Sequence, residues 1–252
     1  MLDIRKSWIE SVNNRKSRRT YKDEDLRKEE ILPLIDLIEE INKETSLNIQ
    51  MIKDCKEGIS GFKASYGMIS GVSNFVALVG NKNIPNYKEK IGYYGEMIVL
   101  EATSLGLGTC WVGGTYDRRE CEKHITMNLD EELLCIIVIG HIEQTLSIKE
   151  KLVASLNKKG KNFNDILITK NKEIPSWVER GIDYALKSPS ALNKKPIGFK
   201  LEKDKIQAVI TTSNHGYEDI DLGIAMLHFK LGAYMEKYDG KWRYEDDKYL
   251  FY

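Results

Sequence analysis

The feature that most constrains the fold is the run GYYGEMIVLEATSLGLGTCWVGG, which extends from Gly92 to Gly114. Its first part, Tyr93–Leu105, has the length of a helix and is apolar on most faces, so we expect a helix buried on several sides. Gly106 and Gly108 follow it, and glycine is the usual residue where a helix ends in a left-handed conformation. Thr109–Val112 then predict a short strand. A chain with such a helix needs a large core around it.

The rest of the chain alternates helical and strand-like patterns. Ser7–Glu10 and Ser176–Glu179 have the S-x-x-E form of a capping box, which predicts that a helix begins at each. A lysine-rich stretch at 149–175 reads as a crossover or linker. Further helices are expected at 29–44, with Pro33 in an early turn, and at 219–237. Strands are expected at 47–53, 74–80, 132–143, 197–202 and 241–246, of which 132–143 is apolar enough for an interior strand.

Composition excludes several classes of protein. The chain has 252 residues, of which 42% are hydrophobic and 30% charged, as in a folded domain. Lys plus Arg and Asp plus Glu are both 38, so no overall charge favours nucleic acid or a membrane as a partner. No apolar stretch suits a signal peptide or a spanning helix. The four cysteines and four histidines lack metal-ligand spacing, so we expect no metal site and a reducing, cytoplasmic location.

The pattern restarts after Pro175, which indicates a degenerate tandem duplication. The helix Ile31–Lys43 and the strand after it parallel a helix over Trp177–Lys187 and its strand, and Tyr93–Leu105 parallels Asp221–Met235. Chance similarity between helices is the alternative. We therefore expect a single composite domain over 1–252 with pseudo-repeat halves at about 1–165 and 166–252.

Three loops carry residues suited to a ligand. The basic loop, Arg15-Lys16-Ser17-Arg18-Arg19, suits a phosphate monoester, because arginine offers a two-pronged donor and serine a hydroxyl; a solvated helix end is the alternative. The glycine turn, Gly113-Gly114, lets a ligand approach backbone N–H groups, although a plain turn would look the same. The third loop, Pro189-Ser190-Ala191-Leu192-Asn193, offers small side chains to a flat ring, or simply ends a helix.

Together these loops resemble the FMN-dependent nitroreductases. RKSRRTY, from Arg15, is similar to that family's R-R-S-x-R-x-F signature, and ALKSPSALNKKPIGF, from Ala185, is similar to A-x-x-A-P-S-x-x-N-x-Q-P-W-x-F. EATSLGLGTCWVGG, from Glu101, resembles the passage A-x-x-L-G-L-G-T-C-W-I-G-G, and IIVIGHIE, from Ile136, resembles the strand that follows. The resemblance implies an α+β nitroreductase-like fold, with a central, mostly antiparallel sheet flanked by helices.

The order of the motifs indicates a divergent branch of this family. Ordinary members are dimers whose basic motif and PSxxN loop follow each other closely, whereas here about 170 residues separate them. The arrangement resembles a single chain with two nitroreductase-like halves sharing one core, which imitates the dimer. That implies a monomer with one complete flavin site.

The resemblance also assigns site residues. It implies that FMN is bound by Arg15, Lys16, Ser17, Arg19, Val112, Gly113, Gly114, Pro189, Ser190, Ala191 and Asn193, and more loosely by Lys159 and Lys161. Three positions depart from the family pattern: Arg18 adds a charge, Lys195 replaces glutamine and Ile197 replaces tryptophan. These departures put FMN affinity in doubt.

The implied activity is flavin chemistry with NADH or NADPH as donor. A nitroaromatic, a quinone or a similar flat small molecule would be reduced by a ping-pong mechanism in which flavin N5 carries the hydride. No catalytic side chain is expected, and Cys110 reads as a buried structural thiol. Phe62 and Tyr66, in the glycine-rich segment 58–71, are candidates for stacking on the substrate. A flavin- or ligand-binding protein without turnover is the main alternative, and flavin breakdown or reductive dehalogenation on the same scaffold is a third.

Overall fold

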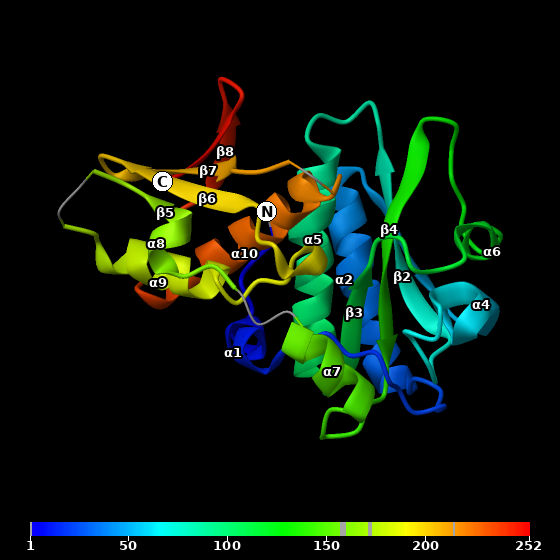
Figure 1. The fold of residues 1–252 in the computed structure, drawn as a ribbon. Coiled ribbons are helices and arrows are strands. Elements are labelled where there is room, and N and C mark those ends of the chain that lie inside the picture. Colours follow the sequence, from blue (N-terminus) through cyan, green and yellow to red (C-terminus); the bar gives the residue numbers. More distant parts are fainter. Residues whose placement is uncertain (1, 157–159, 171–172, 214) are drawn as a thin grey trace. The chain divides into compact units, whose positions relative to one another are not determined.

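The computed structural model describes residues 2–156, 160–170, 173–213 and 215–252, which form two compact units (Figure 1). The first unit consists of Met1–Ile91 with Met97–Leu156, and the second of Gly92–Glu96 with Asn157–Tyr252. A short piece of a helix from the first half of the sequence, Gly92–Glu96, is thus part of the second unit.

The sheet of the first unit is antiparallel and has the order β1-β2-β4-β3. Its strands are β1 (Asn48–Ile52), β2 (Asn74–Asn81), β3 (Gly108–Val112) and β4 (Glu131–Gly140). β4 lies between β2 and β3, and the side chains of its second half are buried. The expectation of an interior strand is therefore confirmed, and β3 is an edge strand.

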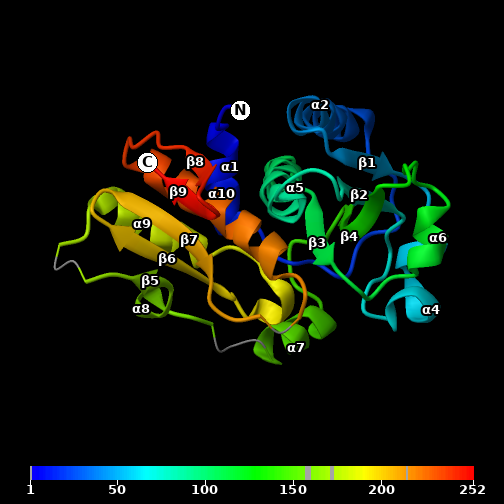
Figure 2. The same cartoon turned by 90° about the horizontal axis from the view of Figure 1, so that it is seen from above.

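Helices lie on both faces of this sheet. In Figures 1 and 2, α2 and α5 lie on one face, whereas α4 and α6 lie on the other. The bounds of the helices that contribute to this unit are α1 Lys6–Asn14, α2 Lys28–Thr45, α3 Lys56–Ile59, α4 Gly61–Ser65, α5 Tyr87–Ser104, α6 Arg118–Glu122 and α7 Ile148–Leu156. The long buried helix is confirmed as α5, although it begins earlier than its apolar run. Gly106 follows it with a φ of 79°, as the sequence predicts.

Both predicted capping boxes are wrong, although both helices exist. α1 begins at Lys6 after Arg5, so Ser7 is already helical, and its carbonyl accepts a hydrogen bond from the Ser11 hydroxyl at 2.8 Å. α9 (Ser176–Ala185) begins at Ser176 itself, after an extended Pro175. A serine with helical backbone angles cannot act as the residue before the helix, which must be extended to cap it.

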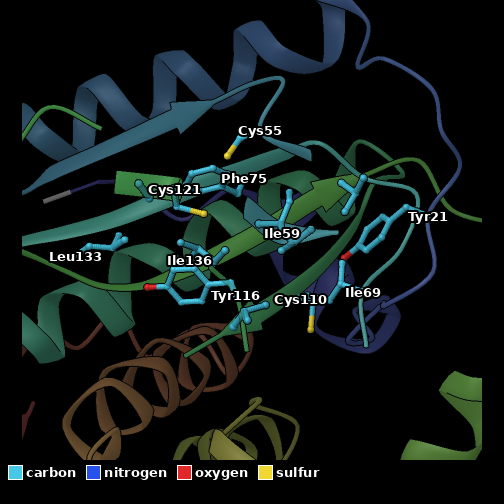
Figure 3. Packing of buried hydrophobic residues seen from close by; sticks show 14 of the residues in the cluster. Tyr21, Cys55, Ile59, Ile69, Phe75, Cys110, Tyr116, Cys121, Leu133 and Ile136 are labelled. Atoms are coloured by element: carbon cyan, nitrogen blue, oxygen red, sulfur yellow. The ribbon is translucent and has the colours of Figure 1, made fainter. Parts of the chain in front are cut away.

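One hydrophobic cluster of the first unit packs on the face of the sheet that carries α3 and α6, and buried residues of α2 and α5 cover the other face. Figure 3 shows Cys55, Ile59 and Cys121 near Phe75, and Ile136 of β4 close to Tyr116. Gly58 lies against both thiols, because a Cβ there would be 2.7 Å from the Cys121 sulfur and 2.8 Å from the Cys55 sulfur. The short helices α3 and α6 therefore pack against each other through small residues.

The second unit has a five-stranded sheet of order β5-β6-β7-β9-β8, with α9 and α10 on one face (Figures 1 and 2). β5 pairs in parallel with β6, and the other neighbours are antiparallel. The bounds are α8 Phe163–Ile166, β5 Leu167–Ile168, β6 Ile197–Glu202, β7 Lys205–Ile210, α10 Glu218–Met235, β8 Trp242–Glu245 and β9 Lys248–Phe251. The sequence predicted neither β7 nor β9, and the supposed linker at 149–175 contains α7, α8 and β5.

Glycines let α9 and α10 approach closely. A Cβ on Gly181 would lie 2.6 Å from the Phe229 ring, and a Cβ on Gly232 would collide with the carbonyl oxygen of Arg180. Phe229 also stacks on Phe199 of β6, with ring centroids 4.9 Å apart. The expected α+β class and the mostly antiparallel pairing are confirmed, with the strands divided between two sheets. Within the described ranges, no helix combines the length and apolarity that crossing a membrane requires.

Candidate functional site

The basic loop of the first unit is fixed along the outer edge of β3. Ser17 forms a parallel bridge with Thr109, and the Arg18 N–H donates to the Thr109 carbonyl at 2.8 Å. Further along, Thr20 forms a second bridge, with Ser70. The loop therefore lies beside the start of an edge strand and is more than a solvated end of α1.

Arg18 is buried inside this loop by a carboxylate from α7. Its side chain is 6% exposed and that of Glu150 is 1% exposed. Arg18 Nε donates to Glu150 Oε1 at 3.0 Å, and its two terminal nitrogens donate to the carbonyls of Glu143 and Thr145. The charge of Arg18, which departs from the family pattern, is thus paired and hydrogen-bonded within the protein.

Glu150 also holds the backbone of the basic loop. Its Oε1 accepts the N–H of Arg19 at 2.7 Å and the N–H of Thr20 at 3.3 Å, while Oε2 accepts the Ser147 N–H at 2.8 Å. Burial by itself would raise the pKa of Glu150, but the hydrogen bonds from Arg18 and from these N–H groups outweigh it and lower the pKa to about 2. A carboxylate that stays ionised therefore sets the shape of the loop.

A pocket of about 200 Å³ opens beside the basic loop. Arg15, Lys16 and Arg18 contribute the cations, and the end of α5 contributes an uncharged wall. Arg15 is half-buried and Lys16 is exposed. The full lining is Asn14, Arg15, Lys16, Arg18, Thr103, Gly106, Leu107, Gly108, Ile142 and Gln144. The structure thus brings two of the predicted phosphate-binding side chains, Arg15 and Lys16, to one cavity in the first unit.

Cys110 faces the same cationic surroundings from β3. The thiol is buried, which raises its pKa, whereas the charges of Arg19 and Arg15 lower it. Burial is the larger effect, so Cys110 stays a protonated thiol, as expected for a structural residue.

The glycine turn lies at the other end of β3. Val112 is buried, Gly113 is half-buried and Gly114 is exposed. At the usual rise per residue of a strand, the chain from Gly108 to Gly113 spans about 16 Å. One strand therefore separates a cationic pocket from an accessible glycine backbone.

Phe62 and Tyr66 lie outside the core in the first unit. The two side chains are 79% and 72% exposed and contact each other edge to face, with centroids 6.4 Å apart. The segment around them is anchored by Ile59 and Ile69, which are buried. The aromatic rings are thus presented to solvent on a fixed base.

The loop that contains Pro189, Ser190, Ala191 and Asn193 lies in the second unit and has an unusual backbone. Leu192, Asn193 and Lys195 have φ values of 52°, 54° and 44°, in the left-handed region. Asparagine tolerates this region, whereas a bulky side chain there costs roughly 1–2 kcal/mol per residue. A strained loop of this kind must be held by its surroundings.

Asp221 of α10 anchors this loop through a backbone N–H group. The Ala191 N–H donates to both of its carboxylate oxygens, at 3.0 and 3.1 Å. Burial raises the pKa of Asp221 to about 7, helped by Glu218 and opposed by the Ala191 N–H and by the charge of Lys195. Lys195 is itself buried, and its Nζ donates to the Ser188 carbonyl.

Lys161 does not extend freely from its loop. Its Nζ donates to the Thr211 hydroxyl at 3.1 Å and to the Ile197 carbonyl at 3.3 Å, which ties it to β6 and to the segment after β7. Burial lowers its pKa. Lys159 lies outside the described residues.

Sequence reasoning missed Glu150 and Asp221. Glu150 lies in a lysine-rich stretch, where a single acid carries no signal for burial. Asp221 does leave a signal, because it lies beside the long, mostly apolar run of the helix at 219–237. A charge on an apolar helix face implies a buried partner.

Comparisons with known proteins identify nitroreductases as similar to this chain. A family model described as "Putative TM nitroreductase" matches residues 7–233. A solved structure described as a putative nitroreductase from Thermotoga maritima is 19% identical with a TM-score of 0.63, and the match covers 100% of this chain and 95% of that one. The search among curated proteins returns no match.

Smaller nitroreductases give partial matches. An FMN-dependent nitroreductase from Clostridium difficile is 18% identical, with a TM-score of 0.44 over 60% of this chain and 97% of that one. A nitroreductase with bound FMN from Desulfitobacterium hafniense is 17% identical, with a TM-score of 0.44 over 56% of this chain and 92% of that one. The family match extends over nearly the whole sequence and includes the basic loop, the glycine turn and the 189–193 loop, so the chain belongs to this nitroreductase family and has its fold.

Proposed function

We propose that the protein is an FMN-dependent oxidoreductase that takes electrons from NADH or NADPH and reduces flat acceptors, such as nitroaromatics and quinones, by a ping-pong mechanism. The observation that carries the proposal is the arrangement along β3 in a member of a nitroreductase family. A cationic pocket lies at the start of this edge strand and an accessible glycine backbone at its end.

The donors along β3 fit the chemistry of FMN. Arg15, Lys16, Ser17 and Arg19 offer the charged and hydroxyl donors that a phosphate monoester requires. The backbone at Val112, Gly113 and Gly114 offers N–H groups without bulky side chains to the nitrogen and oxygen acceptors of a planar ring. The proposed FMN site also includes Pro189, Ser190, Ala191 and Asn193, because their loop matches the family's sequence motif. Lys159 and Lys161 are included on a looser match of sequence.

The chain's own part in the reaction is binding and electrostatics. Bound FMN would supply hydride transfer, which no amino-acid side chain can provide. The N–H groups of the glycine turn would stabilise negative charge on the reduced ring. The exposed rings of Phe62 and Tyr66 would stack on the acceptor. We further propose a cytoplasmic location, where the four free cysteines would stay reduced.

Titration of the purified protein with FMN, followed by flavin fluorescence, tests the cofactor. Arg15→Ala and Arg19→Ala should each weaken FMN binding roughly 10-fold or more, because each removes charge-assisted hydrogen bonds to phosphate. Lys43→Ala removes an exposed cation of the same unit and serves as the matched control. Wild-type protein that binds no FMN would end the proposal.

Anaerobic addition of NADH or NADPH to the FMN complex tests the activity. Bleaching of the flavin absorbance, and its return with a nitroaromatic or quinone, is the expected result. FMN that is bound but stays oxidised would instead show a flavin-binding protein without turnover. Product analysis separates flavin breakdown and dehalogenation from both.

A further inference from the structure

The loop at 189–195 keeps a conformation that its own residues disfavour. Leu192 and Lys195 are bulky residues with left-handed backbone angles, and Asn193 adopts the same region between them. Isolated residues of these types rarely adopt such angles. Contacts with the rest of the second unit must therefore select this conformation.

Hydrogen bonds from three donor groups hold the loop in this conformation. Asp221 accepts the Ala191 N–H with both carboxylate oxygens. The Ser190 hydroxyl oxygen accepts the Lys195 N–H at 2.9 Å. The Lys195 ammonium donates to the Ser188 carbonyl at the start of the loop. Together they fix both ends of the strained stretch.

Two of the side chains that make these bonds, an acid and a base, are buried. Asp221 is 4% exposed and Lys195 is 6% exposed. Other charged or titratable groups also face the Asp221 carboxylate: Glu218 lies in the first turn of α10, and the His215 ring lies 3.7 Å from Oδ2. Asp221 and Lys195 are each hydrogen-bonded to backbone of the loop, and the charge of Lys195 favours the ionised form of Asp221, so the two buried groups also influence each other electrostatically.

We propose that Asp221 and Lys195 are positioning residues that hold the 189–195 loop in its strained conformation, the one in which Ser190, Ala191 and Asn193 contact the flavin. The part that concerns the flavin rests on the proposed function. The departure of Lys195 from the family's glutamine then has a role: the lysine places a buried cation in the loop, which donates to the Ser188 carbonyl and acts electrostatically on Asp221.

The test compares Asp221→Ala, Asp221→Asn and Lys195→Met with two controls. Asp219→Asn alters a neighbouring, less buried acid of the same helix, and Lys194→Met alters the adjacent, exposed lysine. Amide hydrogen exchange of peptides covering 188–196 is measured by mass spectrometry on the FMN-free protein. FMN dissociation constants are measured on the same samples, and circular dichroism checks that each variant is folded.

Asp221→Ala and Lys195→Met should speed exchange in the loop at least 10-fold and raise the FMN dissociation constant roughly 10- to 100-fold, as expected for losing a buried hydrogen bond to a charged group. Asp221→Asn keeps an acceptor for the Ala191 N–H and should restore most of both properties. The controls should match the wild type.

Each part of the proposal is contradicted by a different experimental result. Loop exchange that stays at the wild-type rate in Asp221→Ala and Lys195→Met would overturn the positioning role, whatever FMN does. Faster exchange with unchanged FMN affinity would overturn the assignment of this conformation to flavin contact. Wild-type protein with a protected loop and no FMN binding would instead refute the proposed function. If Asp221→Ala does not fold, Lys195→Met and the Asp221→Asn comparison decide the question.

Discussion

Arg18 and Lys195 are two positions at which this chain departs from its family pattern, and each is a buried cation held by the protein itself. Arg18 pairs with Glu150 in the first unit, and Lys195 bonds to Ser188 near Asp221 in the second. In each unit, a buried carboxylate also accepts backbone N–H groups of a candidate binding loop. The departures therefore shape the loops and need not oppose a ligand.

The Arg18–Glu150 pair should be strongly coupled. Glu150→Gln or Arg18→Met alone should lower the free energy of unfolding by roughly 3–5 kcal/mol, because each leaves an uncompensated buried partner. The double variant should lower the free energy of unfolding by clearly less than the sum of the two single losses. Urea unfolding of the four proteins gives the coupling energy, and costs that simply add would show that the pair does not act as a unit.

Glu150 should also make the protein sensitive to acid. Its pKa falls from 4.5 in the unfolded chain to about 2 in the folded protein, so its contribution is complete above pH 4.5 and is lost as the pH falls toward 2. The contribution is roughly 3 kcal/mol. Unfolding free energies measured between pH 6 and pH 2 should fall less steeply in Glu150→Gln than in the wild type. An identical pH dependence in the two proteins would contradict this assignment.

Asp221 should make stability change with pH in the opposite direction. Burial raises its pKa from 3.8 to about 7, so the folded protein retains a proton that the unfolded chain has released. Its contribution to stability is complete below pH 3.8 and is lost as the pH rises through 7. Asp221→Asn should therefore flatten the decline in unfolding free energy between pH 3.8 and 7, whereas Asp219→Asn should keep it. A steeper decline in Asp221→Asn would reverse the assignment.

At the scale of elements, the second unit depends on the close approach of α9 and α10. Gly232 lies against the Arg180 carbonyl and Gly181 lies against the Phe229 ring. Trp177 of α9 stacks on Tyr238 with centroids 4.1 Å apart, which extends the same contact beyond α10. Because interiors are close-packed, even one added methyl group must displace a neighbour.

Gly232→Ala tests this packing. Alanine favours a helix over glycine by about 1 kcal/mol, yet the collision with Arg180 backbone should reverse that gain and destabilise the protein by roughly 1–3 kcal/mol. Gly160→Ala adds the same methyl group where no atom lies within 4 Å and should leave stability nearly unchanged. Thermal unfolding compares the two, and a Gly232→Ala variant as stable as the wild type would show that the helices can move apart.

At the scale of the whole molecule, the order of elements supports the proposed duplication. The first unit contains α2 followed by β1, and the second contains α9 followed by β6. Likewise α5 precedes β3, and α10 precedes β8. We propose that the chain is an internal pseudo-dimer, although its two sheets differ in their number of strands.

A pseudo-dimer should be monomeric and bind one FMN. Light scattering after gel filtration should give the mass of a single chain, because one chain would already contain both nitroreductase-like halves. Flavin released by denaturation should amount to one FMN per chain. A stable dimer, or two FMN per chain, would contradict the proposal.

The sequence by itself determined the strongly periodic elements, the family and the candidate loops. α2, α5, α10 and the interior strand β4 follow from runs of apolar residues, whose periodicity is a local property. The basic loop and the glycine turn were found from residue types alone. The sequence reasoning missed β7 and β9. Each forms a tight hairpin with the strand before it, and the pairing of β7 with β9 joins segments about 40 residues apart.

Only the tertiary structure decided what the charged residues do. Nothing local shows that Arg18 meets Glu150, since 132 positions separate them, or that Asp221 reaches the Ala191 N–H 30 positions away. A buried charge is stable only beside its partner, and folding alone brings such partners together. The sequence therefore located the loops, and tertiary contacts determined the conformations in which they are held.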